Sequence, residues 1–229
     1  MKNIDTWNKN VSNYINELNQ KLLENEEAVQ LYNGFYVWDS KILQNPKIMF
    51  IGINPGNGNP ENDVKKVITK PCQQMSYLEY LDGENESYTL AKETVEVFYK
   101  NGYNKEEVRN LLNEKTVKTN FFYIITSNQT LIKEAVSKVT DFKSFQLQSY
   151  IFTADLIDIL KPDLVIFEGK SVFDMFKDYD DCTTCEWFEN FGSMQRLDGT
   201  KIIGYSRNLN KYNNIKDLDG FAKYLSQFL

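Results

Sequence analysis

The sequence predicts an α/β fold in which a mainly parallel, four-stranded sheet carries helices on both faces. Segments with apolar residues at helical spacing alternate along the chain with short apolar runs of the kind that forms buried strands. Such an alternation is typical of a mostly parallel sheet. The four runs are KIMFIGI (47–53), TNFFYIITSN (119–128), DLVIFEG (163–169) and KIIGYS (201–206).

The intervening segments predict helices. Residues 5–33 predict one or two helices, and residues 86–114 predict two more, with a break at Asn101-Gly102. A long helix is expected over 141–161, ending before Pro162, and others are expected just after Gly169 and over 215–229. Residues 54–83 predict a long, partly irregular loop. With no linker or repeat, we expect a single domain over 1–229, made of a helical lead-in (1–45) and an α/β core (46–229).

Composition limits the class of protein. The 229 residues include 41% hydrophobic and 25% charged residues, which is ordinary for a soluble globular domain. The polar start, MKNIDTWNKN, is unlike a signal peptide, and no apolar run reaches membrane-spanning length. We therefore expect a cytoplasmic protein that does not insert into membranes. The net charge of −6 disfavours a broad polyanion-binding surface but allows a local basic patch.

The chain has no histidine, and this excludes several mechanisms. Ser-His-Asp and Cys-His catalysis and imidazole acid–base chemistry are ruled out. The three cysteines are Cys72, Cys182 and Cys185, too few for a four-ligand zinc or iron–sulfur site. We expect no metal and no cofactor, and we expect the C-x-x-C pair to be two thiols near a helix or loop.

Polar residues follow the predicted strands, and ligands of parallel sheets bind beyond the carboxyl ends of the strands. The amides, hydroxyls and two cations in these segments suit hydrogen bonding to a neutral heterocycle or a phosphate. Asn120 falls at the start of its predicted strand. The strand ends are Gly52-Ile53-Asn54-Pro55-Gly56, Thr126-Ser127-Asn128, Glu168-Gly169-Lys170-Ser171 and Gly204-Tyr205-Ser206-Arg207-Asn208.

The stretch Gly169-Lys170-Ser171 is similar to the end of a phosphate-binding P-loop. The loop also requires a glycine five residues before Gly169, with four residues between the two, and position 164 is leucine. We expect Ser171 to act as a helix N-cap instead.

Four segments, in order, resemble the uracil-DNA glycosylase superfamily. FIGINPG (50–56) resembles its first motif, most closely that of the mismatch-specific branch, where a strand ends in G-I-N-P-G. KTNFFYI (118–124) resembles the second strand region, and KPDLVIFEGKSVFDMF (161–176) resembles the third strand with its helix. KIIGYSRNLNKYN (201–213) lies where the family carries its second motif, typically H-P-S. The resemblance covers roughly residues 45–229.

The resemblance implies a three-layer α/β/α fold like that of the uracil-DNA glycosylases and a set of site residues. Asn54 matches the asparagine that positions the attacking water, and Asn120 matches the one that reads the base edge. Tyr77 is our choice for the aromatic residue that stacks on the base. The remaining substrate-binding residues would be Gly52, Ile53, Pro55, Gly56 and Ser206, and the DNA-binding residues would be Lys170, Arg207, Asn208 and Lys211.

The second motif departs from the family, since Gly204 or Tyr205 replaces its histidine. Losing one donor to the leaving base typically costs about 10²–10³ in rate. One reading is therefore a slow DNA glycosylase that removes uracil or a related damaged base in base excision repair. The other is a non-catalytic relative that binds a base, nucleotide or nucleic acid. For the first reading we expect a monomer that acts on single- or double-stranded DNA.

Overall fold

The central feature of the computed structural model, which describes residues 3–56, 65–208 and 214–229, is a six-stranded sheet in the order β4-β2-β5-β8-β7-β6. Four of these strands are mutually parallel, which confirms the α/β class and the mostly parallel sheet. The parallel strands are β2 (Ile48–Gly52), β4 (Thr116–Asn120), β5 (Leu164–Phe167) and β8 (Lys201–Tyr205).

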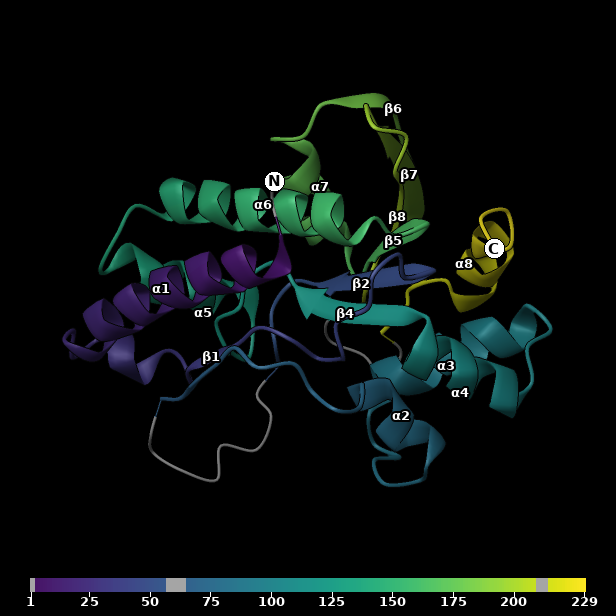
Figure 1. Cartoon of the computed structure of the whole chain (residues 1–229), viewed down its shortest axis with the longest axis horizontal. Helices are drawn as coiled ribbons and strands as arrows, with labels where there is room; N and C mark the ends of the chain where they lie inside the picture. The colour runs from purple at the N-terminus through teal and green to yellow at the C-terminus, as the bar shows by residue number, and fades with distance from the viewer. Residues whose placement is uncertain (1–2, 57–64, 209–213) are drawn as a thin grey trace.

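The prediction of four strands omitted an antiparallel hairpin that extends the sheet beyond β8. Its strands are β6 (Cys182–Phe188) and β7 (Phe191–Arg196), and they rise away from the rest of the sheet in Figure 1. The two cysteines of the C-x-x-C pair therefore lie on a strand rather than on a helix or loop. A separate pair of two-residue strands, β1 (Phe35–Tyr36) and β3 (Val67–Ile68), also forms.

Helices cover both faces of the sheet because its central strands are apolar on both sides (Figure 1). Met49 and Ile51 of β2 belong to one core cluster, and Ile48 and Phe50 belong to the other. The first cluster joins α1 (Ile4–Leu23), 3₁₀-helix η1 (Ala28–Gln30), α5 (Gln129–Ser137), α6 (Phe142–Leu160) and α7 (Lys170–Lys177). The second joins α2 (Ser76–Leu81), α3 (Thr89–Lys100), α4 (Lys105–Glu114) and α8 (Leu218–Leu225).

The predicted N-terminal lead-in is part of the first core cluster. Trp7 and Val11 of α1 are buried there, and the Trp7 indole N–H donates to the backbone oxygen of Phe152 on α6 at 2.8 Å. This helix therefore packs against the sheet-covering helices.

Two predicted boundaries were wrong. Asn120 is the last residue of β4, not the first residue of a strand, because the buried Phe121 and Phe122 belong to the following loop. Asn128 then caps α5 by accepting the backbone N–H of Leu131 at 3.1 Å. The N-cap of α7 is Gly169 rather than Ser171.

Candidate functional site

A row of side chains crosses the carboxyl ends of the four parallel strands. The ladder between β2 and β4 pairs Gly52 with Asn120. Just past β5, the backbone N–H of Glu168 donates to the oxygen of Ile51 at 3.0 Å, so Glu168 lies beside Gly52. The ladder between β5 and β8 then places Tyr205 next to Glu168. Side chains in register on parallel strands share a face, and this row lies on the face covered by α2, α3 and α8.

Gly52 makes room for the polar side chains on either side of it. A Cβ at this position would lie 2.5 Å from Asn120 Oδ1 and 3.2 Å from Glu168 Oε2, so both side chains lean over the β2 backbone. Asn120 is only 4% exposed, and its amide makes no hydrogen bond with any described residue. An amide whose donor and acceptor are both unused by the neighbouring side chains is available to a ligand, which makes Asn120 a candidate binding group.

Glu168 is the buried carboxylate of the site. It is 1% exposed. Its Oε1 accepts a hydrogen bond from the Tyr77 hydroxyl, and its Oε2 lies 3.8 Å from the Lys118 ammonium. Lys118 Nζ also contacts Asp39 Oδ2 at 2.6 Å and lies 4.7 Å from the centre of the Tyr77 ring. One ammonium therefore faces two carboxylates inside the protein.

The cluster fixes the protonation of its lysine and tyrosines. Burial alone would lower the pKa of Lys118, but the Asp39 carboxylate, with help from Tyr88 and Glu168, raises it well above the ordinary value. Burial, together with the Glu168 charge, raises the pKa values of Tyr77 and Tyr205 well above the ordinary value. At neutral pH Lys118 is therefore a fixed cation, and both phenols are neutral.

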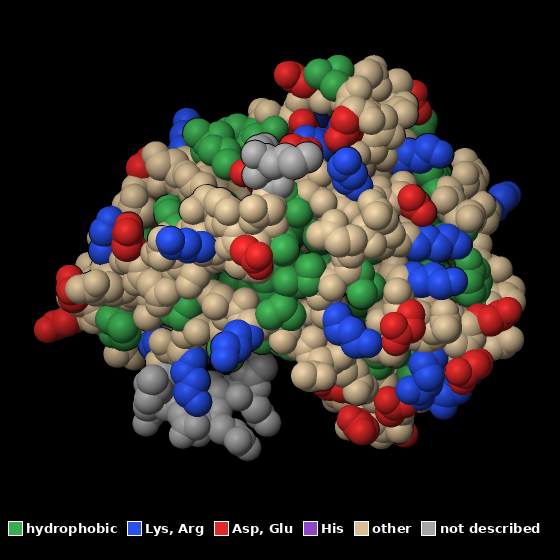
Figure 2. Space-filling view, in the orientation of Figure 1, with side chains coloured by type: hydrophobic (Ala, Val, Ile, Leu, Met, Phe, Trp, Pro, Cys, Tyr) green, Lys and Arg blue, Asp and Glu red, His purple; other side chains and the backbone are tan. Residues whose placement is uncertain are grey.

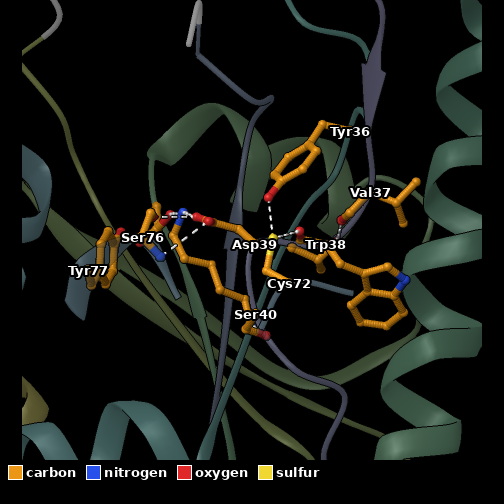
Figure 3. Close-up of polar contacts among 11 residues, drawn as sticks. Tyr36, Val37, Trp38, Asp39, Ser40, Cys72, Ser76 and Tyr77 are labelled. Carbon is orange, nitrogen blue, oxygen red and sulfur yellow. Dashed lines mark hydrogen bonds and ion pairs between the residues drawn. The ribbon is translucent and has the colours of Figure 1, made fainter. Parts of the chain in front are cut away.

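Asp39 is held by groups from two other segments. Its Oδ2 accepts the Ser76 hydroxyl at 2.7 Å as well as the Lys118 ammonium, and Figure 3 shows Asp39 directed toward Ser76. In the same view, Cys72 lies between Tyr36 and Trp38; its thiol contacts the Tyr36 hydroxyl and donates to the Trp38 carbonyl at 3.2 Å. Asp39, in the segment that follows β1, therefore holds the Lys118 ammonium of β4 in place.

Asn54 lies at the same edge of the sheet, but its amide nitrogen faces Thr126. It donates to the Thr126 carbonyl at 3.0 Å and to its hydroxyl at 3.2 Å, and to the carbonyl of Pro55 at 2.8 Å. The Asn54 amide oxygen has no hydrogen-bond partner among the described residues. The first motif thus leaves one fixed acceptor.

Hydrogen bonds hold the first residues of the segment after β8. The backbone N–H of Ser206 donates to Asn190 O at 2.6 Å, Arg207 Nη2 donates to Asn214 Oδ1 at 3.0 Å, and Asn208 N–H donates to Asn214 O at 2.9 Å. Arg207 Nε is buried without a partner among the described residues, and Arg207 Cδ would lie 3.6 Å from a Cβ on Gly169. Lys211 lies outside the described residues.

Lys170 opens α7 and forms an ion pair with Asp174 at 2.6 Å. One of the two lysines among the predicted DNA-binding residues is therefore paired with a carboxylate. In the view of Figure 2, basic and acidic side chains are interspersed over α2 to α4 rather than separated.

The structure brings together only part of the predicted site. Gly52 and Asn120 lie in the central row, and Asn54 lies at its edge. Tyr77 is fully buried against Phe50, with ring centres 5.8 Å apart, and so has no open face for a base.

Sequence reasoning missed the roles of three residues that the structure gathers here, Asp39, Lys118 and Glu168. Glu168 was visible as a polar end to the buried run DLVIFEG. Lys118 was visible only once β4 is seen to begin at Thr116.

Comparisons with known proteins add no family. No protein-family model matches the chain, and no curated protein matches it significantly. Among the described residues, no group of three or more cysteines and acidic residues is arranged to hold a metal ion. No helix in the described ranges is both long and apolar enough to cross a bilayer.

Proposed function

We propose that the chain is a DNA glycosylase that hydrolyses the N-glycosidic bond of uracil or a related damaged base in DNA. Residues 1–229 would form a single uracil-DNA glycosylase-like domain, with 1–45 as its helical lead-in, that acts as a monomer. The observation that carries the proposal is Asn120, which is 4% exposed, lies beside Gly52 at the carboxyl edge of the sheet, and has a side-chain amide with no hydrogen-bond partner among the described residues.

Asn120 has the chemistry needed to read a flipped pyrimidine. Its amide offers a donor and an acceptor side by side, which match the carbonyl and N–H groups of a uracil edge. An extruded base is recognised through such contacts, which offset an unstacking cost of about a few kcal/mol.

Asn54 and Glu168 would serve the hydrolytic step. The Asn54 nitrogen is held by Thr126, which leaves its oxygen to accept a proton of the attacking water. The Glu168 carboxylate, which lies beside Gly52, would favour the positive charge that develops on the sugar. Arg207, which lies beside Gly169, would contact a phosphate.

The state of Lys118 favours a glycosylase that does not cleave the DNA strand, because strand cleavage of this kind needs a free amine as nucleophile. A protonated, ion-paired amine is not a nucleophile, and Lys118 is both. The product would therefore be an intact strand with an abasic site.

The test uses protein in excess over a labelled oligonucleotide with one uracil, either single-stranded or opposite guanine. We expect abasic sites, revealed as breaks only after alkali, and a rate loss of about 10²-fold or more in Asn120→Ala and Asn54→Ala. Asn10→Ala, on the exposed side of α1, is the matched control and should cleave normally. Unchanged cleavage by folded Asn120→Ala would overturn the assignment.

Base binding without cleavage is the second candidate, and Tyr205 favours it. Gly204 or Tyr205 would stand where the family's second motif has its donor; glycine has no side chain to donate, and Tyr205 is 1% exposed with a hydroxyl that has no partner among the described residues. No abasic product from folded wild-type protein, together with Asn120-dependent binding of the uracil oligonucleotide, would select this candidate.

A further inference from the structure

Strand β6 contains an irregularity between its two cysteines. In the ladder with β7, Cys182 pairs with Arg196, and Cys185 pairs with Met194. Three residue steps on β6 thus match two on β7, so one extra residue forms a β-bulge. Side chains three apart on a regular strand point to opposite faces, but this bulge returns Cys182 and Cys185 to the same face.

The burial of β6 supports the same orientation independently. Cys182, Cys185 and Trp187 are half-buried, whereas Thr183, Thr184, Glu186 and Phe188 are exposed. The half-buried residues pack against the core cluster that contains α7, and the Trp187 ring meets the Phe173 ring at 4.9 Å. Both thiols therefore face α7 rather than solvent.

The spacing allows the two sulfur atoms to bond. Two residue steps along a strand span about 6.6–6.8 Å between Cα atoms, and a bulge bends the strand and shortens this span. Disulfides join Cα atoms about 4.4–6.8 Å apart. The thiols also interact: burial raises the pKa of Cys185, Lys177 opposes the rise, and Cys182 adds to it.

We propose that Cys182 and Cys185 form a redox-reactive dithiol that a small-molecule disulfide converts to an intramolecular disulfide. One cysteine, as thiolate, attacks the small disulfide, forms a mixed disulfide and releases one small thiolate. The second cysteine attacks the protein sulfur of that mixed disulfide and releases the other small thiolate. The two cysteines lose two electrons to the reagent, and their two protons leave to solvent. This chemistry is independent of the proposed glycosylase activity.

Cys72 provides an internal comparison. It lies in another part of the fold, where its thiol contacts Tyr36 and donates to the Trp38 carbonyl. It has no cysteine partner there and should remain a thiol, or at most carry a single adduct.

The test equilibrates the full chain with mixtures of reduced and oxidised glutathione. Remaining thiols are then alkylated, and disulfides are mapped by mass spectrometry. The same titration is run in concentrated urea, where the bulge is absent. We expect a Cys182–Cys185 disulfide. The equilibrium constant for its formation from glutathione disulfide should be at least about tenfold larger in the folded chain than in urea. Cys72→Ser should keep this disulfide, and Cys182→Ser should lose it.

Three results would overturn the proposal. They are an equal or smaller constant in the folded chain than in urea, glutathione adducts without an internal disulfide, and a disulfide that includes Cys72.

Discussion

At the scale of the residue, Gly52 determines whether the row of site side chains can form. Asn120 and Glu168 approach the β2 backbone from the two neighbouring strands, and only a residue without a Cβ leaves them room. We predict that Gly52→Ala lowers the free energy of unfolding by about 1–3 kcal/mol, because one of the two side chains must move. Urea denaturation measures the change.

Gly56 is the matched control for that substitution. It lies in the same motif, but a Cβ there would have no heavy atom of the described residues within 4 Å apart from its chain neighbours. Gly56→Ala should change stability by less than about 0.5 kcal/mol. Equal losses in the two variants would show that crowding over β2 is not the cause.

Lys118 is the residue whose removal should be most costly. Lys118→Met would leave the buried Glu168 without its cation and Asp39 without its closest partner. Breaking a buried ion pair costs about 3–5 kcal/mol, and we expect a loss of that size in urea denaturation. Lys41→Met, which removes an exposed pair with Glu114, should cost less than about 1 kcal/mol. A loss of less than about 1 kcal/mol for Lys118→Met would contradict the conclusion that Lys118 stabilises the fold by pairing with Asp39 and Glu168.

Sequence could predict the residues of the short motif but not the cluster beneath it. Gly52 and Asn54 stand together in G-I-N-P-G, so their place at a strand end is visible in the sequence. Asp39 and Lys118 are 79 residues apart and meet only because β4 lies beside the segment after β1. No local spacing encodes such a contact.

At the scale of the element, apolar periodicity predicted the parallel strands and most of the helices. It missed α2, which lies in a segment expected to be a loop, as well as α5, β6 and β7. β6 alternates exposed with half-buried positions, and its bulge interrupts the period of two that would mark it as a strand. The length of β4 was misjudged for the opposite reason, since Phe121 and Phe122 are buried without belonging to a strand.

Helix α3 fixes the segment that follows β8 through one buried carboxylate. Glu93 is 6% exposed and accepts the backbone N–H groups of Asn214 at 2.8 Å and Ile215 at 2.6 Å. We predict that Glu93→Gln lowers the free energy of unfolding by about 1.5–3 kcal/mol, because the amide presents only one acceptor to two donors. Amide hydrogen exchange should accelerate at 214 and 215.

Glu96 lies on the same helix and is the control for Glu93. It is more exposed and makes only a surface pair with Lys100 at 3.8 Å. Glu96→Gln should leave both stability and exchange at 214 and 215 unchanged. Faster exchange in both variants would mean that the helix, rather than the carboxylate, holds the segment.

At the scale of the whole molecule, stability rests on two apolar cores that share one sheet, and buried tyrosines lie in both. Tyr32 belongs to the first core and Tyr205 to the second. Burial raises the pKa values of Tyr14 and Tyr32 to about 12. In strongly alkaline solution the buried phenols ionise more readily in the unfolded chain than in the folded one, and this destabilises the fold.

The dependence of stability on pH follows from these shifts. A phenol whose folded pKa exceeds its unfolded value, about 10, contributes stability that is fully present below pH 10 and lost as pH rises toward 12. The chain has no histidine, so no imidazole titrates between pH 6 and 8. Urea midpoints should therefore be level from pH 6 to 8 and fall steeply above about pH 10. Phenolate absorbance should rise in the same transition, whereas chain unfolded in urea should titrate near pH 10. Tyr32→Phe should weaken the alkaline decline, and a decline already present between pH 6 and 8 would contradict this account.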